Sequence, residues 1–186
     1  MVDVSTVLDG NEGDTSTIPG GPRVYDPGMA QPRWLNQREA RAWRQFLLMQ
    51  GQVRGRVGGR LQRETGLSEA DYEVLVNLSE APDGRLRPSE LGGATQWEKS
   101  RISHHVKRME ERGLVKRMAC PTDRRGAFVV LTAAGRRAIE RAAPLHVEHV
   151  REMFIDALTP AQLDSLAEIS EAVLERLTDG PEGCDE

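Results

Sequence analysis

The feature that most constrains this chain is a basic island in an otherwise acidic sequence. Residues 85–125 contain 11 Lys or Arg and 5 Asp or Glu, whereas the remaining residues contain 14 and 24, so charges of +6 and −10 sum to the net −4. The island holds a helical segment at 95–109 and a hairpin that ends Asp123-Arg124-Arg125-Gly126. Positive charge on one helix and one turn is typical of a DNA-binding surface.

Apolar residues at helical spacing predict three helices in the first part of the folded region. A long helix covers 34–62, and Ser68 opens the second helix. A turn at 81–84 precedes a short third helix, which begins at Pro88 and ends at the glycine pair 92–93. The fold class that we predict is mainly helical with one small β-hairpin.

Two strands are predicted next, at 114–119 and 127–131, because both stretches are rich in β-branched and apolar residues. The polar stretch 120–126 between them is longer than a tight two-residue turn. Thr132 caps a long helix, and Thr159 with the following proline opens the last one, which ends at 178.

The two ends of the chain differ in composition from its middle. Residues 1–31 contain five acidic residues and one basic residue among many Gly, Pro, Ser and Thr, which predicts a disordered acidic arm. Residues 179–186 form a similar acidic tail. We therefore expect a single folded domain over 32–178.

Several functional classes find no support in the sequence. No apolar run approaches the roughly 20 residues of a membrane span, and no secretory signal is visible at the N-terminus. Cys120 and Cys184 lie far apart and form no metal or redox spacing. There is no phosphate-binding glycine loop, serine elbow or strained pair of carboxylates. We expect a cytoplasmic protein that is not an enzyme and carries no cofactor or metal.

The fourth helix, over 96–112, carries the clearest functional pattern. Thr95 and Glu98 have the spacing of a capping box that starts it. Ile102, Val106 and Met109 share one side and are predicted to face the core. The other side collects serine, histidine, arginine and lysine, which are able to contact bases and phosphates. The short third helix, a glycine turn and this helix match a helix-turn-helix.

Together these residues resemble the bacterial MarR family of winged helix-turn-helix transcription regulators. The resemblance rests on Ser100-Arg101-Ile102-Ser103-His104-His105-Val106, Arg112-Gly113-Leu114-Val115, Asp123-Arg124-Arg125-Gly126 and Leu131-Thr132-Ala133-Ala134-Gly135. It covers about residues 34–178, with a DNA-binding lobe at about 67–131.

The resemblance implies roles for individual residues. In the family the wing carries an Asp-x-Arg motif, whose arginine enters the minor groove while its aspartate steadies that arginine. The resemblance therefore implies these roles for Arg125 and Asp123. The recognition helix 96–112 would enter the major groove, and the wing 120–126 the minor groove. The full predicted DNA-binding set is Trp97, Lys99, Ser100, Arg101, Ser103, His104, His105, Lys107, Arg108, Asp123, Arg124 and Arg125.

The resemblance also implies a homodimer whose N- and C-terminal helices intertwine and which reads a palindromic operator. Trp34, Trp43 and Phe46 are candidates for lining a small-molecule pocket, and ordinary dimer-core packing is the alternative for each. His146 and His149 have a spacing that suits a metal with a third ligand, although helical histidines are more often surface or interface residues.

The sequence therefore predicts a sequence-specific DNA-binding regulator, in particular a repressor that a small molecule releases from double-stranded DNA. Two alternatives stay open. One is a constitutive or architectural DNA binder without an effector. The other is a winged helix that binds a protein partner, for which a basic wing with Arg124 and Arg125 has no evident use.

Overall fold

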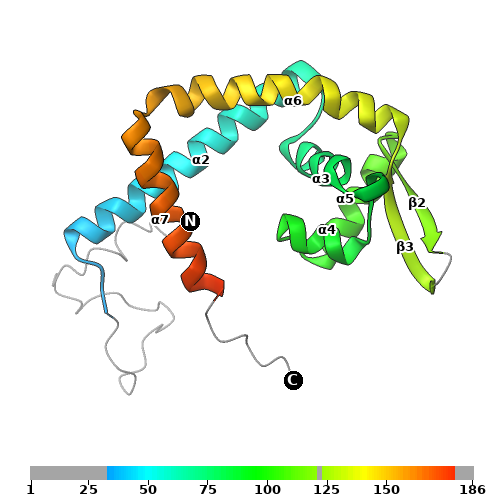
Figure 1. Cartoon of the computed structure of the whole chain (residues 1–186), viewed down its shortest axis with the longest axis horizontal. Helices are drawn as coiled ribbons and strands as arrows, with labels where there is room; N and C mark the ends of the chain where they lie inside the picture. Colours follow the sequence, from blue (N-terminus) through cyan, green and yellow to red (C-terminus); the bar gives the residue numbers. More distant parts are fainter. Residues whose placement is uncertain (1–32, 121–122, 179–186) are drawn as a thin grey trace, which may run out of the picture. The chain divides into compact units, whose positions relative to one another are not determined.

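The computed structural model describes residues 33–120 and 123–178, and the chain divides into two units at residues 52 and 53. Helix α2 (Gln37–Thr65) extends from the first unit into the second (Figure 1). Asn36 begins it with a reciprocal cap: Asn36 Oδ1 accepts from the Glu39 amide at 3.0 Å, and Glu39 Oε2 accepts from the Asn36 amide at 2.9 Å. The predicted long first helix is confirmed, although it begins and ends three residues later than the predicted range of 34–62.

The second unit contains a lobe of three helices and a small sheet. Helix α3 (Glu69–Glu80) is capped by Ser68, as predicted, through reciprocal hydrogen bonds with Asp71. The predicted turn is the short 3₁₀ segment η1 (Pro82–Gly84). Helices α4 (Pro88–Thr95) and α5 (Lys99–Glu111) follow, and they form the helix-turn-helix.

The boundary between α4 and α5 differs from the prediction. Helix α4 continues through both glycines to Thr95, whose hydroxyl donates to the Leu91 carbonyl at 2.7 Å, so the predicted capping box of Thr95 and Glu98 is wrong. Gln96, in a left-handed conformation with φ 56°, ends α4. Gly92 lies in a tight place, because a Cβ there would lie 3.1 Å from the Trp97 carbonyl oxygen.

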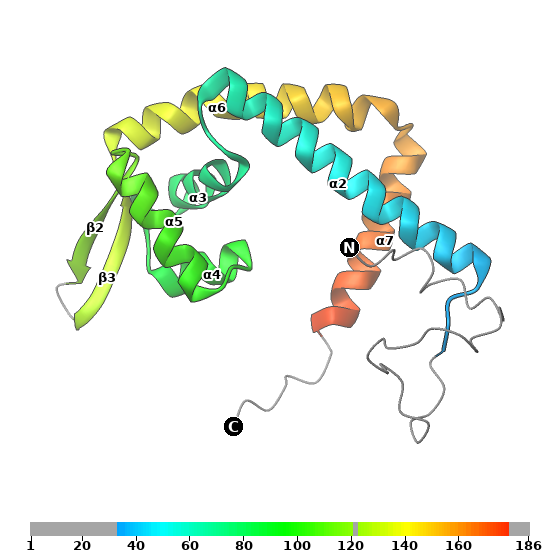
Figure 2. The same ribbon diagram turned by 180° about the vertical axis from the view of Figure 1, so that it is seen from behind.

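The sheet has three antiparallel strands in the order β1-β3-β2, namely β1 (Arg85–Leu86), β2 (Val115–Cys120) and β3 (Asp123–Leu131). Strand β1 was not predicted. The predicted long connection at 120–126 is wrong, because β2 and β3 extend until only residues 121–122 separate them. The register shifts between Ala119 and Cys120. Both ribbon views place this hairpin beside α5 (Figures 1 and 2).

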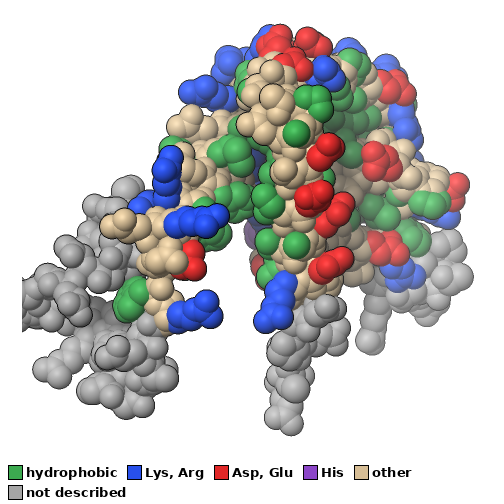
Figure 3. All heavy atoms as spheres, turned by 60° about the vertical axis from the view of Figure 1, so that its left-hand side comes forward, with side chains coloured by type: hydrophobic (Ala, Val, Ile, Leu, Met, Phe, Trp, Pro, Cys, Tyr) green, Lys and Arg blue, Asp and Glu red, His purple; other side chains and the backbone are tan. Residues whose placement is uncertain are grey.

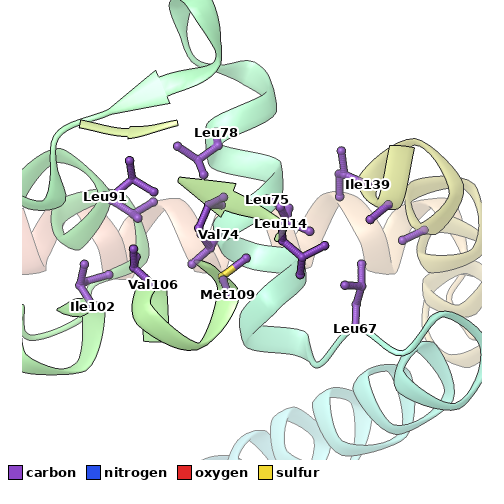
Figure 4. Close-up of a cluster of buried hydrophobic side chains, with 14 of the residues drawn as sticks. Leu67, Val74, Leu75, Leu78, Leu91, Ile102, Val106, Met109, Leu114 and Ile139 are labelled. Atoms are coloured by element: carbon purple, nitrogen blue, oxygen red, sulfur yellow. The ribbon is translucent and has the colours of Figure 1, made fainter. Parts of the chain in front are cut away.

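Apolar side chains from the helices and the sheet meet in one core (Figure 4). The predicted inward residues of α3 and α5 are all buried there, and burying each such side chain contributes about 1.5–3 kcal/mol. The largest fully buried apolar residues are Leu61, Val74, Leu75, Leu78, Leu91, Ile102, Val106, Met109, Val115 and Val129.

Two helices complete the chain, α6 (Ala133–Met153) and α7 (Pro160–Thr178), with the 3₁₀ turn η2 (Ile155–Ala157) between them. Thr132 caps α6, as predicted, by accepting a hydrogen bond from the Gly135 amide at 3.0 Å. No residue of α7 is buried, and four of its apolar side chains are exposed in the single chain, namely Ile169, Val173, Leu174 and Leu177. Figure 3, which brings the α7 side forward, shows hydrophobic side chains among acidic ones on this face.

Within the described residues, no helix combines the length and the apolar character that crossing a membrane would require.

Candidate nucleic-acid interface

Helix α5 is fixed to the lobe by one side and exposes the other. Ile102, Val106 and Met109 are buried against α3 and the sheet. Seven predicted DNA-binding residues of this helix are exposed: Lys99, Ser100, Arg101, Ser103, His104, Lys107 and Arg108. We refer to these seven residues as the α5 face. It carries four cationic side chains.

A shallow hollow of about 490 Å³ lies along one edge of the α5 face. Three cations, two histidines and one acidic residue line it together with Ala70 of α3: Arg101, His104, His105, Lys107, Arg108 and Glu111. The hollow is open to solvent, so the arginine and lysine side chains that line it are accessible to an anionic partner.

Trp97 and His105 do not belong to the exposed surface, contrary to the prediction. Trp97 is 9% exposed and His105 is 5% exposed, so both rings are largely covered by the protein. Their rings meet edge to face with centroids 5.3 Å apart. His105 is buried because it finds a polar partner on α3, which a helical wheel of α5 alone does not reveal.

That partner is Asp71, a buried carboxylate that holds α5 to α3. His105 Nε2 lies 3.1 Å from Asp71 Oδ1, and Arg112 Nη1 donates to Asp71 Oδ2 at 2.7 Å. Burial alone would raise the pKa of Asp71, but the adjacent His105 ring and the hydrogen bonds from Arg112 and Ser68 outweigh burial and hold the pKa well below its ordinary value. Asp71 is therefore ionised throughout the physiological range.

Two arginines of the α5 face contact these buried rings. The Arg101 guanidinium carbon lies 3.9 Å from the centroid of the Trp97 ring. Arg108 Nη2 lies 2.8 Å from His105 Nδ1 and donates to it, because a guanidinium has only donors. Both side chains are thus oriented by contacts within the protein.

The basic surface continues from α5 onto the sheet through residues that the prediction did not include. Arg117 of β2 donates from Nη2 to the Ser103 carbonyl at 3.2 Å. Arg85 and Arg87 lie over the Phe128 ring, with guanidinium carbons 5.1 and 5.4 Å from its centroid. The available signal was that all three arginines belong to the basic island, and recognition of strand β1 would have placed Arg85 on the sheet.

The predicted wing residues Asp123, Arg124 and Arg125 lie at the start of β3 in the backbone. Their side chains, and that of Cys120, lie outside the described residues, as does Cys184. Their roles remain predictions that rest on the family resemblance.

The comparisons with known proteins agree with this architecture. Residues 65–126 match the model of the MarR family. The chain is 41% identical to AbsC, a MarR family transcriptional regulator from Streptomyces coelicolor, with a TM-score of 0.74 over 79% of this chain and 99% of AbsC. The chain belongs to the MarR family.

Two further solved structures are similar to this MarR-family chain. Sco3205, a MarR family transcriptional regulator from Streptomyces coelicolor crystallised with DNA, is 40% identical, with a TM-score of 0.77 over 83% of this chain and 97% of Sco3205. CouR from Rhodococcus jostii RHA1, crystallised with p-coumaroyl-CoA, is 27% identical, with a TM-score of 0.58 over 69% of this chain and 89% of CouR.

Curated bacterial transcriptional regulators match at 28–32% identity, and the chain spans between 51% and 90% of their lengths. The first of these matches spans 58% of its relative. The relatives are regulators rather than enzymes.

The predicted ligand-pocket residues lie in the first unit. Trp43 and Phe46 stack on one turn of α2 with centroids 5.8 Å apart, and both are 45% exposed. Trp34 is 53% exposed. Neither of the two roles considered for them, a ligand pocket or a dimer core, is tested by the single chain.

The two histidines of α6 contact different residues and do not face a common site. His149 is buried, with Nε2 2.9 Å from Glu64 Oε2, and His146 stacks on Tyr72 with centroids 4.2 Å apart. Burial and, to a smaller extent, the neighbouring His149 lower the pKa of His146. Across residues 33–120 and 123–178, no three His, Cys, Asp or Glu side chains are grouped as metal ligands.

Proposed function

We propose that this MarR-family chain acts as a homodimer that reads a palindromic DNA operator, with α5 in the major groove and the 120–126 wing in the minor groove. The observation that carries the proposal is the α5 face: a helix packed by one side into a core, with four cations and three hydrogen-bonding side chains on the other. Double-stranded DNA offers both a negative backbone and groove edges for such a helix.

The position of each side chain on the helix suggests its part in binding. Arg101 lies in the first turn of α5, where a recognition helix contacts base edges, and its planar fork suits the two acceptors of guanine. Lys107 lies two turns further along, and its compact ammonium suits a phosphate. On the wing, Arg125 would insert into the minor groove while Asp123 steadies it. The 40% identity to Sco3205, a relative crystallised with DNA, supports this docking mode.

A dimer is supported by the apolar stripe of α7. Ile169, Val173, Leu174 and Leu177 are between 54% and 72% exposed in the single chain. Contiguous apolar surface of this kind is rare on soluble monomers and marks an interaction site. A second copy of the chain would bury the stripe symmetrically, and a two-fold dimer matches a palindromic operator.

We further propose that the protein is a repressor whose DNA affinity is lowered by a small molecule. CouR, a relative with 27% identity, was crystallised with p-coumaroyl-CoA, which supports an aromatic or thioester class of effector. Such a ligand would stabilise a dimer in which the two recognition helices are wrongly spaced for the operator, a population shift of a few kcal/mol.

Selection of bound duplexes from random DNA tests the central proposal. Enrichment of a palindrome with half-sites about one helical turn apart would support a dimeric operator reader. Retention of all duplexes alike would indicate an architectural binder, and retention of none would favour a protein partner. Titration of the selected operator complex with aromatic carboxylates and their CoA thioesters then tests the effector, since an architectural binder would keep its affinity.

A further inference from the structure

We propose that Trp97 is a positioning residue for DNA recognition: its buried ring sets the direction of the Arg101 guanidinium, and the Asp71–His105 pair holds that ring in place. This inference rests on the proposed function, because it assigns the means by which one side chain of the α5 face is prepared for a base. Trp97 itself lies too deep to contact DNA.

The stack between Arg101 and Trp97 leaves the recognition edge of the guanidinium free. A cation within about 6 Å of an indole centroid is attracted to the ring face, and here the distance is 3.9 Å. Stacking uses the flat face of the guanidinium, whereas hydrogen bonds to guanine use the N–H groups in its plane. The same side chain is therefore able to remain stacked while it donates two hydrogen bonds to a base.

The Trp97 ring is in turn held by His105, one turn after Arg101 on α5, and through it by Asp71 of α3. The His105 ring meets Trp97 edge to face at 89°, and His105 Nε2 lies 3.1 Å from Asp71 Oδ1. Asp71 is anchored to the first turn of α3 by the Ser68 amide, at 2.9 Å. The orientation of Arg101 is thus linked to the rigid body of the lobe, through contacts that are present before DNA binds.

A second cation depends on the same assembly. Arg108 Nη2 lies 2.8 Å from His105 Nδ1, so the ring that contacts Trp97 also holds this second guanidinium. Arg101 and Arg108 are seven residues apart and lie on the same side of α5. Holding both in place before binding reduces the side-chain entropy that is lost when DNA is bound.

A purely structural role for Trp97 makes a different prediction. If the ring only filled space, a leucine of smaller volume would weaken the fold but would act on DNA affinity independently of Arg101. If the ring positions Arg101, the loss on removing it requires Arg101 to be present. A double-mutant cycle separates the two roles.

The experiment compares wild type, Trp97→Leu, Trp97→Phe, Arg101→Ala and the Trp97→Leu/Arg101→Ala double variant on the selected operator, well below each unfolding midpoint. We expect Trp97→Leu to weaken operator binding about 3- to 30-fold with Arg101 present and less than twofold without it. Trp97→Phe keeps an aromatic face and should lose less. Equal losses in both backgrounds would overturn the positioning role. Should Trp97→Leu not fold, Trp97→Phe and the Trp97→Phe/Arg101→Ala double variant complete the same cycle.

A measurement without DNA keeps this inference separate from the proposed function. In the free protein, the ring current of Trp97 should shift the Arg101 Nε–H proton resonance upfield, and Trp97→Phe should reduce that shift. An unshifted Arg101 resonance in wild type would overturn the stack whatever the protein binds. A shifted resonance together with equal affinity for all duplexes would leave the stack intact and contradict operator reading instead.

Discussion

Arg112 Nη1 donates to Asp71 Oδ2 at 2.7 Å, and this contact joins the C-terminal end of α5 to the first turn of α3. The Asp71 side chain is 5% exposed, whereas that of Arg112 is 44% exposed, so the carboxylate depends on its partners more than the guanidinium does. The position of α5 in the lobe therefore relies on one buried charge.

Replacing that charge should destabilise the lobe in a pH-dependent way. Asp71→Asn is expected to lower the free energy of unfolding by about 3 kcal/mol at neutral pH, because it removes one partner of a buried pair. The folded pKa of Asp71 is depressed, so its contribution is fully present above about pH 4, the ordinary range of an aspartate, and is lost as pH falls through the lower folded pKa.

Urea unfolding at fixed protein concentration between pH 2 and pH 7 measures this effect. The difference between wild type and Asp71→Asn should stay constant from pH 5 to pH 7 and shrink below pH 4. Asp164→Asn, on the exposed surface of α7, is the matched control and should change stability by less than about 0.5 kcal/mol. A difference that grows toward low pH would show that Asp71 is not stabilised in its charged form.

Of the glycines in the part of the chain that the structure describes, Gly135 has the closest neighbours, so its replacement should be the most costly. A Cβ there would lie 2.1 Å from the Leu114 carbonyl oxygen and 2.8 Å from Leu131 Cδ1, so α6 would have to move away from the sheet. Gly135→Ala is expected to destabilise the protein by about 3 kcal/mol. In Gly93→Ala the added methyl group meets open space in α4, and a gain of up to about 1 kcal/mol is expected. Thermal unfolding of both variants tests this difference. Similar unfolding midpoints for Gly135→Ala and Gly93→Ala would contradict the close packing at Gly135.

Substitutions on the α5 face should separate base contacts from phosphate contacts. Arg101→Ala and Arg125→Ala are expected to cost about 1–3 kcal/mol of operator binding and to reduce discrimination between operator and random duplex. Lys107→Ala should weaken both duplexes alike and, because the dimer carries two copies of this lysine, make the salt slope shallower by about two. Binding titrations on the two duplexes provide the test. If all three substitutions act equally on both duplexes, these roles are misassigned.

The apolar stripe of α7 predicts how the dimer can be broken. Leu174→Glu places a charge on a side chain that is 62% exposed in the single chain and that a partner copy would bury. We expect at least a hundredfold weaker dimerisation by sedimentation, with loss of operator binding. Glu168→Gln, on the opposite side of the same helix, is the control and should stay dimeric. A Leu174→Glu dimer of full strength would place the interface elsewhere.

The parts of the fold that follow local patterns were predictable from the sequence. Apolar spacing placed the buried stripes of α3 and α5, and the caps at Ser68 and Thr132 were confirmed because each depends on residues within three positions. The short strand β1 was missed, since two residues show no alternation and form a strand only by pairing with Val129 and Val130.

The exposed cations of the candidate site were predictable from the sequence, but the buried residues behind them were not. The cationic residues of α5 are exposed as the helical wheel indicates. The burial of His105 depends on Asp71, which lies 34 positions earlier in the sequence on another helix, so no pattern within α5 reveals it. The burial of Trp97 likewise follows from the turn after α4, where Gly92 accepts the Trp97 amide at 3.0 Å.

The salt dependence of operator binding tests most directly whether the α5 face is the DNA-binding surface. A dimer that neutralises on the order of ten phosphates should give a slope near −9 in a plot of log affinity against log salt concentration. The triple variant Arg101→Ala/Lys107→Ala/Arg108→Ala removes six cations per dimer, of which the two Arg101 side chains are assigned to bases, and should make the slope shallower by about 4. Arg38→Ala/Arg41→Ala/Arg176→Ala, with three exposed arginines removed elsewhere, should leave it unchanged. A wild-type slope shallower than about −3, or an unchanged slope in the α5 triple variant, would contradict the account.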